Sequence, residues 1–140
     1  MTLRPFLSAD IAAARALWQA TPGVGLSGAD EPATLESFLN RNPGTSFVAE
    51  SDGRITGTIL VGHDGRRGLI HHLAVAADCR RTGLGRRLVE VGLAALHQAG
   101  IDKCHLMVFT DNTGGAAFWT SVGAKRRGEL ALYSLATAPH

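Results

Sequence analysis

The residues best suited to chemistry form a run of arginines and glycines, Arg80-Arg81-Thr82-Gly83-Leu84-Gly85-Arg86, between a strand-like segment and a long helix-like segment. Glycine has no side chain to block close approach, so consecutive N–H groups around Gly83 and Gly85 can converge on an anion. The helix N-terminus adds partial positive charge, and arginine guanidinium groups bind phosphate in a bidentate manner. The pattern favours binding of a pyrophosphate.

Another interpretation of this run is a turn that needs glycine torsions beside a solvated arginine cluster. The run is not a Walker phosphate loop, because the spacing and the phosphate-binding lysine of that loop are absent. It is not a dinucleotide Gly-x-Gly-x-x-Gly motif either, because Leu88 stands where the third glycine would be.

Two further segments narrow the interpretation. Leu73-Ala74-Val75 precedes Arg80-x-x-Gly83-x-Gly85, and Asn112-x-x-x-Ala116-x-x-Trp119-x-x-x-Gly123 follows downstream. This order resembles the GNAT superfamily of N-acetyltransferases, whose signature is Arg/Gln-x-x-Gly-x-Gly/Ala after a Leu-Ala-Val strand, followed by Asn-x-x-x-Ala-x-x-Tyr-x-x-x-Gly. The resemblance covers essentially the whole chain, and it is strongest from Leu69 to Gly123.

The resemblance implies an acetyl-CoA site in which two strands splay apart and the pantetheine arm lies in the gap. Leu73 and Val75 would supply main-chain groups, with the Val75 N–H donating to the thioester oxygen. Asn112 would contact the arm or orient the helix after it, and it is also a good helix N-cap. The implied cofactor contacts are Leu73, Ala74, Val75, Arg80, Arg81, Thr82, Gly83, Leu84, Gly85, Arg86, Asn112 and Trp119.

Attack on a thioester needs a neutral amine, yet an alkylamine has a pKa of about 10.4 and is protonated at neutral pH. His71 is the first candidate for the base, because strand alternation places it on the same face as Leu73 and directs His72 the other way. A histidine two residues before such a Leu-Ala-Val segment also resembles the arylalkylamine N-acetyltransferase branch, where it belongs to a proton relay. Glu50 is the second candidate. The alternatives are a packing role for His71 and a solvated carboxylate for Glu50.

The general acid of the superfamily is missing, because Trp119 stands where a tyrosine commonly protonates the leaving thiolate. An indole N–H can donate a hydrogen bond but is too weak an acid to transfer a proton. Water, Tyr133 or Ser121 would have to substitute, although Tyr133 also suits a packing role.

These groups must be positioned by elements that the apolar periodicity locates. Helical spacing is expected from Ser8, as the N-cap, through Trp18, around Leu35 to Leu39, from Gly83 to Ala99, and from Thr113 to Val122. Strands are expected at Thr2 to Phe6, Ser46 to Ser51, Arg54 to Gly62, Leu69 to Val75, Lys103 to Phe109 and Ala124 to Ala136. Asp52-Gly53 and Asp64-Gly65 are hairpin-turn signals, and Gly100 suits a helix C-terminus.

The resulting order is β-α-α-β-β-β-α-β-α-β in one domain over residues 1–140. It predicts an α/β (α+β) fold with a mixed, mostly antiparallel sheet of about six to seven strands and helices on both faces.

The composition excludes several other classes. With 14 basic and 12 acidic side chains, the net charge of +2 does not indicate nucleic acid or a membrane as a partner. Cys79 and Cys104 lack metal-ligand spacing, so we expect no metal. The chain starts without a signal-type apolar segment and has no apolar run near the roughly 20 residues that span a bilayer, so we expect a cytoplasmic protein.

The sequence therefore favours acetyl transfer from acetyl-CoA to an amine, in a monomer or homodimer. A catalytically silent acyl-CoA-binding module is the alternative that Trp119 suggests. A third reading uses the arginines from Arg80 to Arg87 and Lys125-Arg126-Arg127 to bind nucleic acid, but it lacks interleaved aromatic residues. The acceptor amine stays open, although Asp30, Glu31 and Glu36 could attract a cation.

Overall fold

A computed structural model describes residues 1–138 and divides the chain into two compact units, Met1–Phe109 and the part from Thr110 onward. The first unit contains five strands, β1 Thr2–Pro5, β2 Phe47–Ser51, β3 Arg54–His63, β4 Gly68–Val75 and β5 Cys104–Leu106. Its α-helices are α1 Ile11–Gln19, α2 Pro32–Arg41 and α3 Leu84–Gln98, with short 3₁₀ turns at Ser8–Asp10, Gly28–Asp30 and Ala77–Cys79. The second unit contains α4, Thr113–Ser121.

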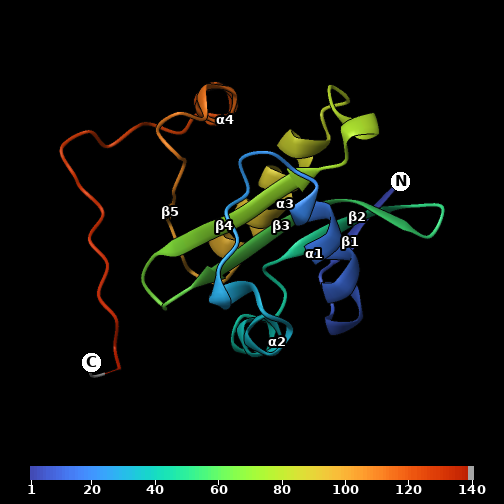
Figure 1. Ribbon diagram of the computed structural model, residues 1–140, viewed down its shortest axis with the longest axis horizontal. Helices are drawn as coiled ribbons and strands as arrows, with labels where there is room; N and C mark the ends of the chain where they lie inside the picture. Colours follow the sequence, from blue (N-terminus) through green and yellow to red (C-terminus); the bar gives the residue numbers. More distant parts are fainter. Residues whose placement is uncertain (139–140) are drawn as a thin grey trace. The chain divides into compact units, whose positions relative to one another are not determined.

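The strands form one sheet in the order β1-β2-β3-β4-β5 (Figure 1). The first four are antiparallel neighbours, and β5 runs parallel to β4. Asp52 and Gly53 both have positive φ, at 51° and 76°, as the tight hairpin turn between β2 and β3 requires. The mixed, mostly antiparallel sheet that the sequence predicts is therefore confirmed.

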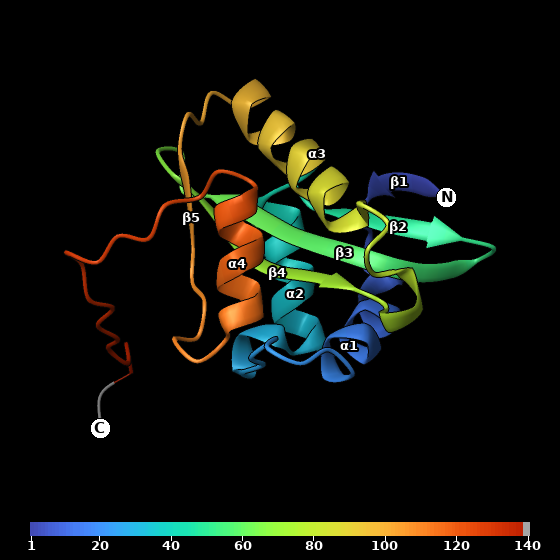
Figure 2. The ribbon, with the colours of Figure 1, turned by 90° about the horizontal axis from the view of Figure 1, so that it is seen from above.

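Helices cover both faces of this sheet, as predicted, with α3 on one side and α1 and α2 on the other (Figure 2). On the α3 side, a Cβ added to Gly92 would lie 3.3 Å from Ile59 and Val61 of β3, so the missing side chain lets α3 approach closely. Helical spacing predicts that Ile11, Ala14, Leu17 and Trp18 form the inward face of α1, and the structure confirms it: Ile11, Ala14 and Trp18 are buried, and Leu17 is partly buried against the core. The buried residues join a core with Phe6, Leu35, Val48, Leu60 and Ala74.

The expected strand count is wrong, because the described residues form five strands and not about six to seven. The strand expected at Ala124 to Ala136, a segment that lies wholly among the described residues, does not form. Three cationic residues, Lys125-Arg126-Arg127, stand near its start, and its apolar alternation slips out of phase between Leu132 and Tyr133. Alternation that changes phase specifies the register of a strand only weakly.

Two other boundaries differ from expectation. Ser8 does not cap α1, because a 3₁₀ turn comes first and the Asp10 carboxylate accepts the Leu7 N–H at 2.9 Å. The strand expected from Lys103 to Phe109 is reduced to Cys104–Leu106, which pairs with Gly68–Ile70 of β4.

Candidate functional site

The central feature of the first unit is an unpaired length of β4. Its pairing with β5 ends at Ile70, while its pairing with β3 continues to Val75. Within residues 1–138, no strand pairs with the outer edge of Leu73–Val75. An open strand edge presents main-chain donors and acceptors to whatever lies beside it, and an extended ligand with amide groups can add to it as a further strand.

The backbone phase of β4 shows which groups face this open edge. The Ala76 N–H donates to the Thr56 carbonyl at 2.8 Å, so Ala76 directs its main chain towards β3. In an antiparallel pair, successive residues alternate in this respect, so Ala74 also faces β3 while Leu73 and Val75 face the gap. The Arg80 Nε donates to the Val75 carbonyl at 3.2 Å from that side. Ala74, with its methyl group in the core, offers the gap no polar group.

The glycine-containing turn between β4 and α3 is built from left-handed residues. Arg81 has φ of 63° and Gly83 of 83°, and the Thr82 hydroxyl donates to the Cys79 carbonyl at 2.7 Å. The first N–H of α3 with a helical acceptor is that of Arg87, which donates to the Gly83 carbonyl at 3.1 Å. The Leu84 and Gly85 N–H groups therefore point out of the helix end, where its dipole favours an anion.

His71 is placed differently from the sequence prediction. Leu60 pairs with His72 and Val61 with Ile70, so His71 is the extra residue of a β-bulge. Leu73 pairs with Ile59 on the α3 side, whereas the His71 ring meets the Phe38 ring of α2 edge-on, with centroids 5.5 Å apart. His72 also lies on the α1 and α2 side, against Trp18. The predicted shared face of His71 and Leu73 is thus wrong, because a bulge interrupts alternation.

The bulge gives His71 a distinct environment. The ring remains exposed at its outer side, but partial burial against its neighbours lowers the pKa of His71 below 6.5. The nearby His72 lowers this pKa further, and Asp30 opposes both effects. His71 is therefore mostly neutral at pH 7, which is the state that a base needs.

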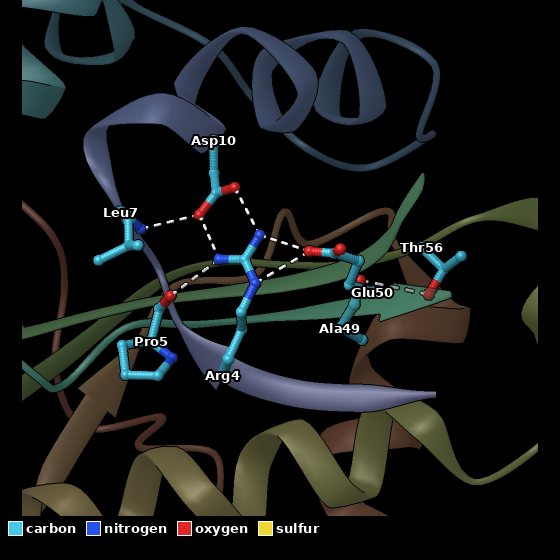
Figure 3. A network of polar contacts seen from close by, with 7 residues as sticks. All are labelled: Arg4, Pro5, Leu7, Asp10, Ala49, Glu50 and Thr56. Carbon is cyan, nitrogen blue, oxygen red and sulfur yellow. Dashed lines mark hydrogen bonds and ion pairs between the residues drawn. The ribbon is translucent and has the colours of Figure 1, made fainter. Parts of the chain in front are cut away.

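Glu50, the second candidate base, belongs to an ion-pair network at the β1 end of the sheet (Figure 3). Its Oε2 accepts hydrogen bonds from the Arg4 Nε at 2.9 Å and from Nη2 at 2.6 Å. The same guanidinium binds both carboxylate oxygens of Asp10 at 2.8 Å. This network ties β1, β2 and the turn before α1 together, which gives Glu50 a structural role.

Replacing Arg4 with methionine is expected to destabilise the protein by about 2 kcal/mol at pH 7, because the buried Asp10 carboxylate loses its charged partner. The Arg4 hydrogen bonds lower the pKa of Asp10 below 3.8; desolvation opposes them, and the Leu7 N–H assists. A lowered pKa stabilises the fold above the unfolded-state pKa, and the benefit is lost as the pH falls. Urea unfolding between about pH 7 and pH 3 should show a shallower acid loss in Arg4→Met than in wild type. Parallel curves would contradict this assignment.

A buried polar pair that the sequence analysis missed connects the turn before α2 to β4. The His72 Nε2 donates to the Asp30 Oδ1 at 2.6 Å, and both residues are less than 10% exposed. The second oxygen of Asp30 accepts the Ser27 N–H at 3.0 Å. Beside the pair, the Trp18 indole donates to the Thr58 hydroxyl at 2.8 Å. The only signal in the sequence was a histidine on the inward phase of an apolar strand.

Arg86, another predicted cofactor contact, lies in α3, and the remaining predicted residues lie in the second unit. Asn112 caps α4 as predicted, since its Oδ1 accepts the Gly115 N–H at 2.9 Å. The Trp119 ring meets the Phe118 ring edge-on at 5.2 Å, and the Ser121 hydroxyl donates to the Phe118 carbonyl at 2.6 Å. Tyr133 lies in the irregular segment after α4. Roles for Asn112 and Trp119 at the cofactor, and for Tyr133 or Ser121 as acids, stay predictions.

Two features are absent from residues 1–138. No group of three or more His, Cys, Asp or Glu side chains is arranged to hold a metal ion. No helix in the same range is both long and apolar enough to cross a bilayer.

The sequence profile of the acetyltransferase (GNAT) family matches residues 11–124 of this chain. A curated acetyltransferase of Pectobacterium atrosepticum is 37% identical over 83 residues, which span 59% of this chain and 59% of that relative. The chain therefore aligns with less than two thirds of the length of that curated relative.

Two solved structures show the same fold. Naa20 of Chaetomium thermophilum, in complex with a bisubstrate analogue, has a TM-score of 0.75 and is 26% identical, over 88% of this chain and 70% of that one. AAC(6')-Iy, in complex with the bisubstrate analogue CoA-S-monomethyl-acetylneamine, has a TM-score of 0.76 and is 15% identical, over 96% of this chain and 97% of that one.

Proposed function

Because the chain belongs to the acetyltransferase (GNAT) family, we propose that it transfers an acetyl group from acetyl-CoA to a primary amine. The observation that carries this proposal is the open edge of β4 at Leu73 and Val75, next to the outward-facing N–H groups of the α3 turn. One feature suits an extended amide-containing arm, and the other suits a pyrophosphate. The complexes of Naa20 and AAC(6')-Iy with bisubstrate analogues support the proposal.

The acetyl donor, acetyl-CoA, fits the residues at both ends of the site formed by the open edge of β4 and the turn before α3. Main-chain groups of Leu73 and Val75 would bond to the pantetheine arm, and the N–H groups of Leu84 and Gly85 would bond to the pyrophosphate. Leu84 would contribute only its main chain, because its side chain is 1% exposed and belongs to the core. Arg80, held at the Val75 carbonyl, would add positive charge beside the same site.

The transfer would proceed by direct attack in a ternary complex. His71 would accept a proton from the ammonium form of the acceptor, and the neutral amine nitrogen would then form a bond to the thioester carbon. The Val75 N–H would stabilise the resulting oxyanion. The C–S bond would then break to release CoA thiolate, and the nitrogen would lose its second proton to water as the amide forms. With Trp119 in the usual tyrosine position, the thiolate would take its proton from water, Tyr133 or Ser121.

The first experiment is a thermal shift assay of the purified protein with acetyl-CoA, CoA and ATP. We expect both CoA species to raise the Tm, since a ligand at 100 times its Kd stabilises a fold by about 2.7 kcal/mol. ATP should give a smaller shift because it lacks the pantetheine arm. Release of free thiol with an amine panel then tests transfer. No stabilisation by either CoA species would count decisively against the proposal.

The variant Gly85→Glu is expected to bind acetyl-CoA at least about tenfold more weakly than the wild-type protein, because it places a carboxylate beside the pyrophosphate. An acidic residue in the first turn favours the helix dipole, so the fold should not be weakened. Gly85→Gln is the neutral control of the same size, and isothermal titration measures both Kd values. Equal affinity of the two variants would show that the donor phosphates lie elsewhere.

Trp119 favours a second candidate function, an acyl-CoA-binding module that does not turn over. In that case acetyl-CoA would raise the Tm while no amine released thiol, and Trp119→Tyr would restore activity. Turnover by the unmodified protein eliminates this candidate.

A further inference from the structure

An exposed apolar strip lies beside the gap between β4 and β5. Leu69 pairs with Gly62, where an added Cβ would lie 2.6 Å from the Phe38 ring of α2, so Leu69 is on the α1 and α2 side. His105 of β5 pairs with Leu69, and beyond the end of β5 exposed and half-buried residues keep alternating from Cys104 to Phe109, so Met107 and Phe109 project on the same side as His105. Leu69 is 38% exposed, and Met107 and Phe109 are each 60% exposed. This is the side on which the candidate base His71 lies.

The loop between α1 and α2 extends the strip. A Cβ added to Gly25 would lie 2.8 Å from the Phe109 Cζ, so the loop backbone rests against that ring. Val24 packs on the core cluster, and Leu26 is 39% exposed. The loop from Thr21 to Ala29 contains no charged residue. Loop and strand end therefore present one uncharged, largely apolar wall.

The acidic side chains that were expected to attract a cationic acceptor already have partners. Asp30 is buried and bonded to His72, Glu31 lies 3.7 Å from Arg15, and Glu36 accepts a hydrogen bond from Ser8. The polar side chains on this side of β4 and β5 include the imidazoles of His71 and His105, which carry no negative charge. Within Met1–Phe109, none of the contacts of these three carboxylates, including the 64% exposed Glu31, joins them to the strip, so the strip itself offers apolar contact.

We propose that the acceptor is a monoamine carried on an apolar alkyl or aryl body, with that body packed on the strip of Leu26, Leu69, Met107 and Phe109. This inference rests on the proposed acetyl transfer and assigns its acceptor class. An apolar body loses water-exposed area on this wall, whereas a second ammonium group would have to give up its hydration there without an anionic partner.

The test measures kcat/KM for ethylamine, butylamine and hexylamine, and for 1,6-diaminohexane as the matched dication. We expect kcat/KM to rise by up to about fourfold for each methylene that is buried. Hexylamine should exceed 1,6-diaminohexane by at least about tenfold. A flat chain-length series, or preference for the diamine, would overturn the acceptor assignment while acetyl transfer itself stood. Absence of turnover with every amine, with or without binding of acetyl-CoA, would overturn the transfer activity and the assignment with it.

A variant series tests the strip directly. Phe109→Ala should lower kcat/KM for hexylamine about tenfold and for ethylamine less than about twofold, with the KM for acetyl-CoA unchanged. Leu93→Ala removes an equally apolar side chain, 42% exposed, from α3 on the other face of the sheet and should change neither value. An equal loss for both amines in Phe109→Ala would show that Phe109 supports the fold and does not contact the acceptor.

Discussion

Replacing His72 with alanine is expected to lower the free energy of unfolding by about 3 kcal/mol. The variant removes the donor that lies 2.6 Å from the Asp30 carboxylate, and it leaves that buried oxygen without its partner. It also removes a ring whose centroid lies 4.6 Å from that of Trp18, which leaves a cavity in the core. Urea unfolding, followed by tryptophan fluorescence and circular dichroism, measures the change.

A double-mutant cycle separates the hydrogen bond from the packing. Asp30→Ala and His72→Ala combined should cost at least about 1 kcal/mol less than the sum of the single variants, because each single variant leaves one buried group unpaired. His105→Ala, which truncates an exposed histidine on β5, is the control and should change stability by less than about 0.5 kcal/mol. Additive single effects would show that Asp30 and His72 stabilise the fold independently.

The helices and the strand meander could be predicted because their signals are local. Helical spacing identified the buried face of α1 through Ile11, Ala14 and Trp18, and the positive φ of Gly100 agrees with its predicted place after α3. Asp52-Gly53 forms its turn with both residues at positive φ. At Asp64-Gly65 only the glycine has positive φ, and the Asp64 side chain instead accepts the N–H groups of Arg66 and Arg67. The local sequence therefore predicted the position of this turn but not its type.

The geometry of the candidate site could not be predicted from strand alternation alone, because it depends on a β-bulge. A β-bulge adds one residue to one strand, and nothing in the letters His71-His72 marks which residue is extra. The bulge also lies where pairing between β4 and β5 stops, and a bulge bends its strand, which accounts for the short β5. The predicted gap between these strands therefore agrees with the structure, while the predicted face of His71 does not.

Polar partners that are far apart in the sequence could not be predicted either. Asp30 and His72 are 42 residues apart, and Arg4 and Glu50 are 46 apart. Taken alone, each carboxylate is consistent with a solvated surface group, and the sequence predicts that Asp30 attracts an amine. Only the fold shows that its charge is used within the protein, which changes the expected acceptor from a cation held by carboxylates to an amine held by apolar contact.

Replacing His71 with glutamine is expected to lower kcat for amine acetylation by about 100-fold, within the range that general base catalysis supplies. Glutamine keeps a polar side chain of similar reach but cannot accept a proton at neutral pH. The ring is exposed at its outer side, so the fold and the KM for acetyl-CoA should be retained. Glu50→Gln is the matched variant for the second candidate base, and because that carboxylate is held by Arg4, its kcat should stay within about threefold of wild type.

The pH dependence distinguishes a base from a residue that only shapes the site. Burial lowers the pKa of His71 below 6.5, so the wild-type kcat should fall only under acidic conditions, as the imidazole becomes protonated and cannot accept the amine proton. In His71→Gln this acid limb should disappear while the rate stays low, because no group titrates in its place. If the variant keeps the acid limb at its wild-type position with a uniformly lower rate, another group takes the proton, and a loss of the limb in Glu50→Gln would identify that carboxylate as the base.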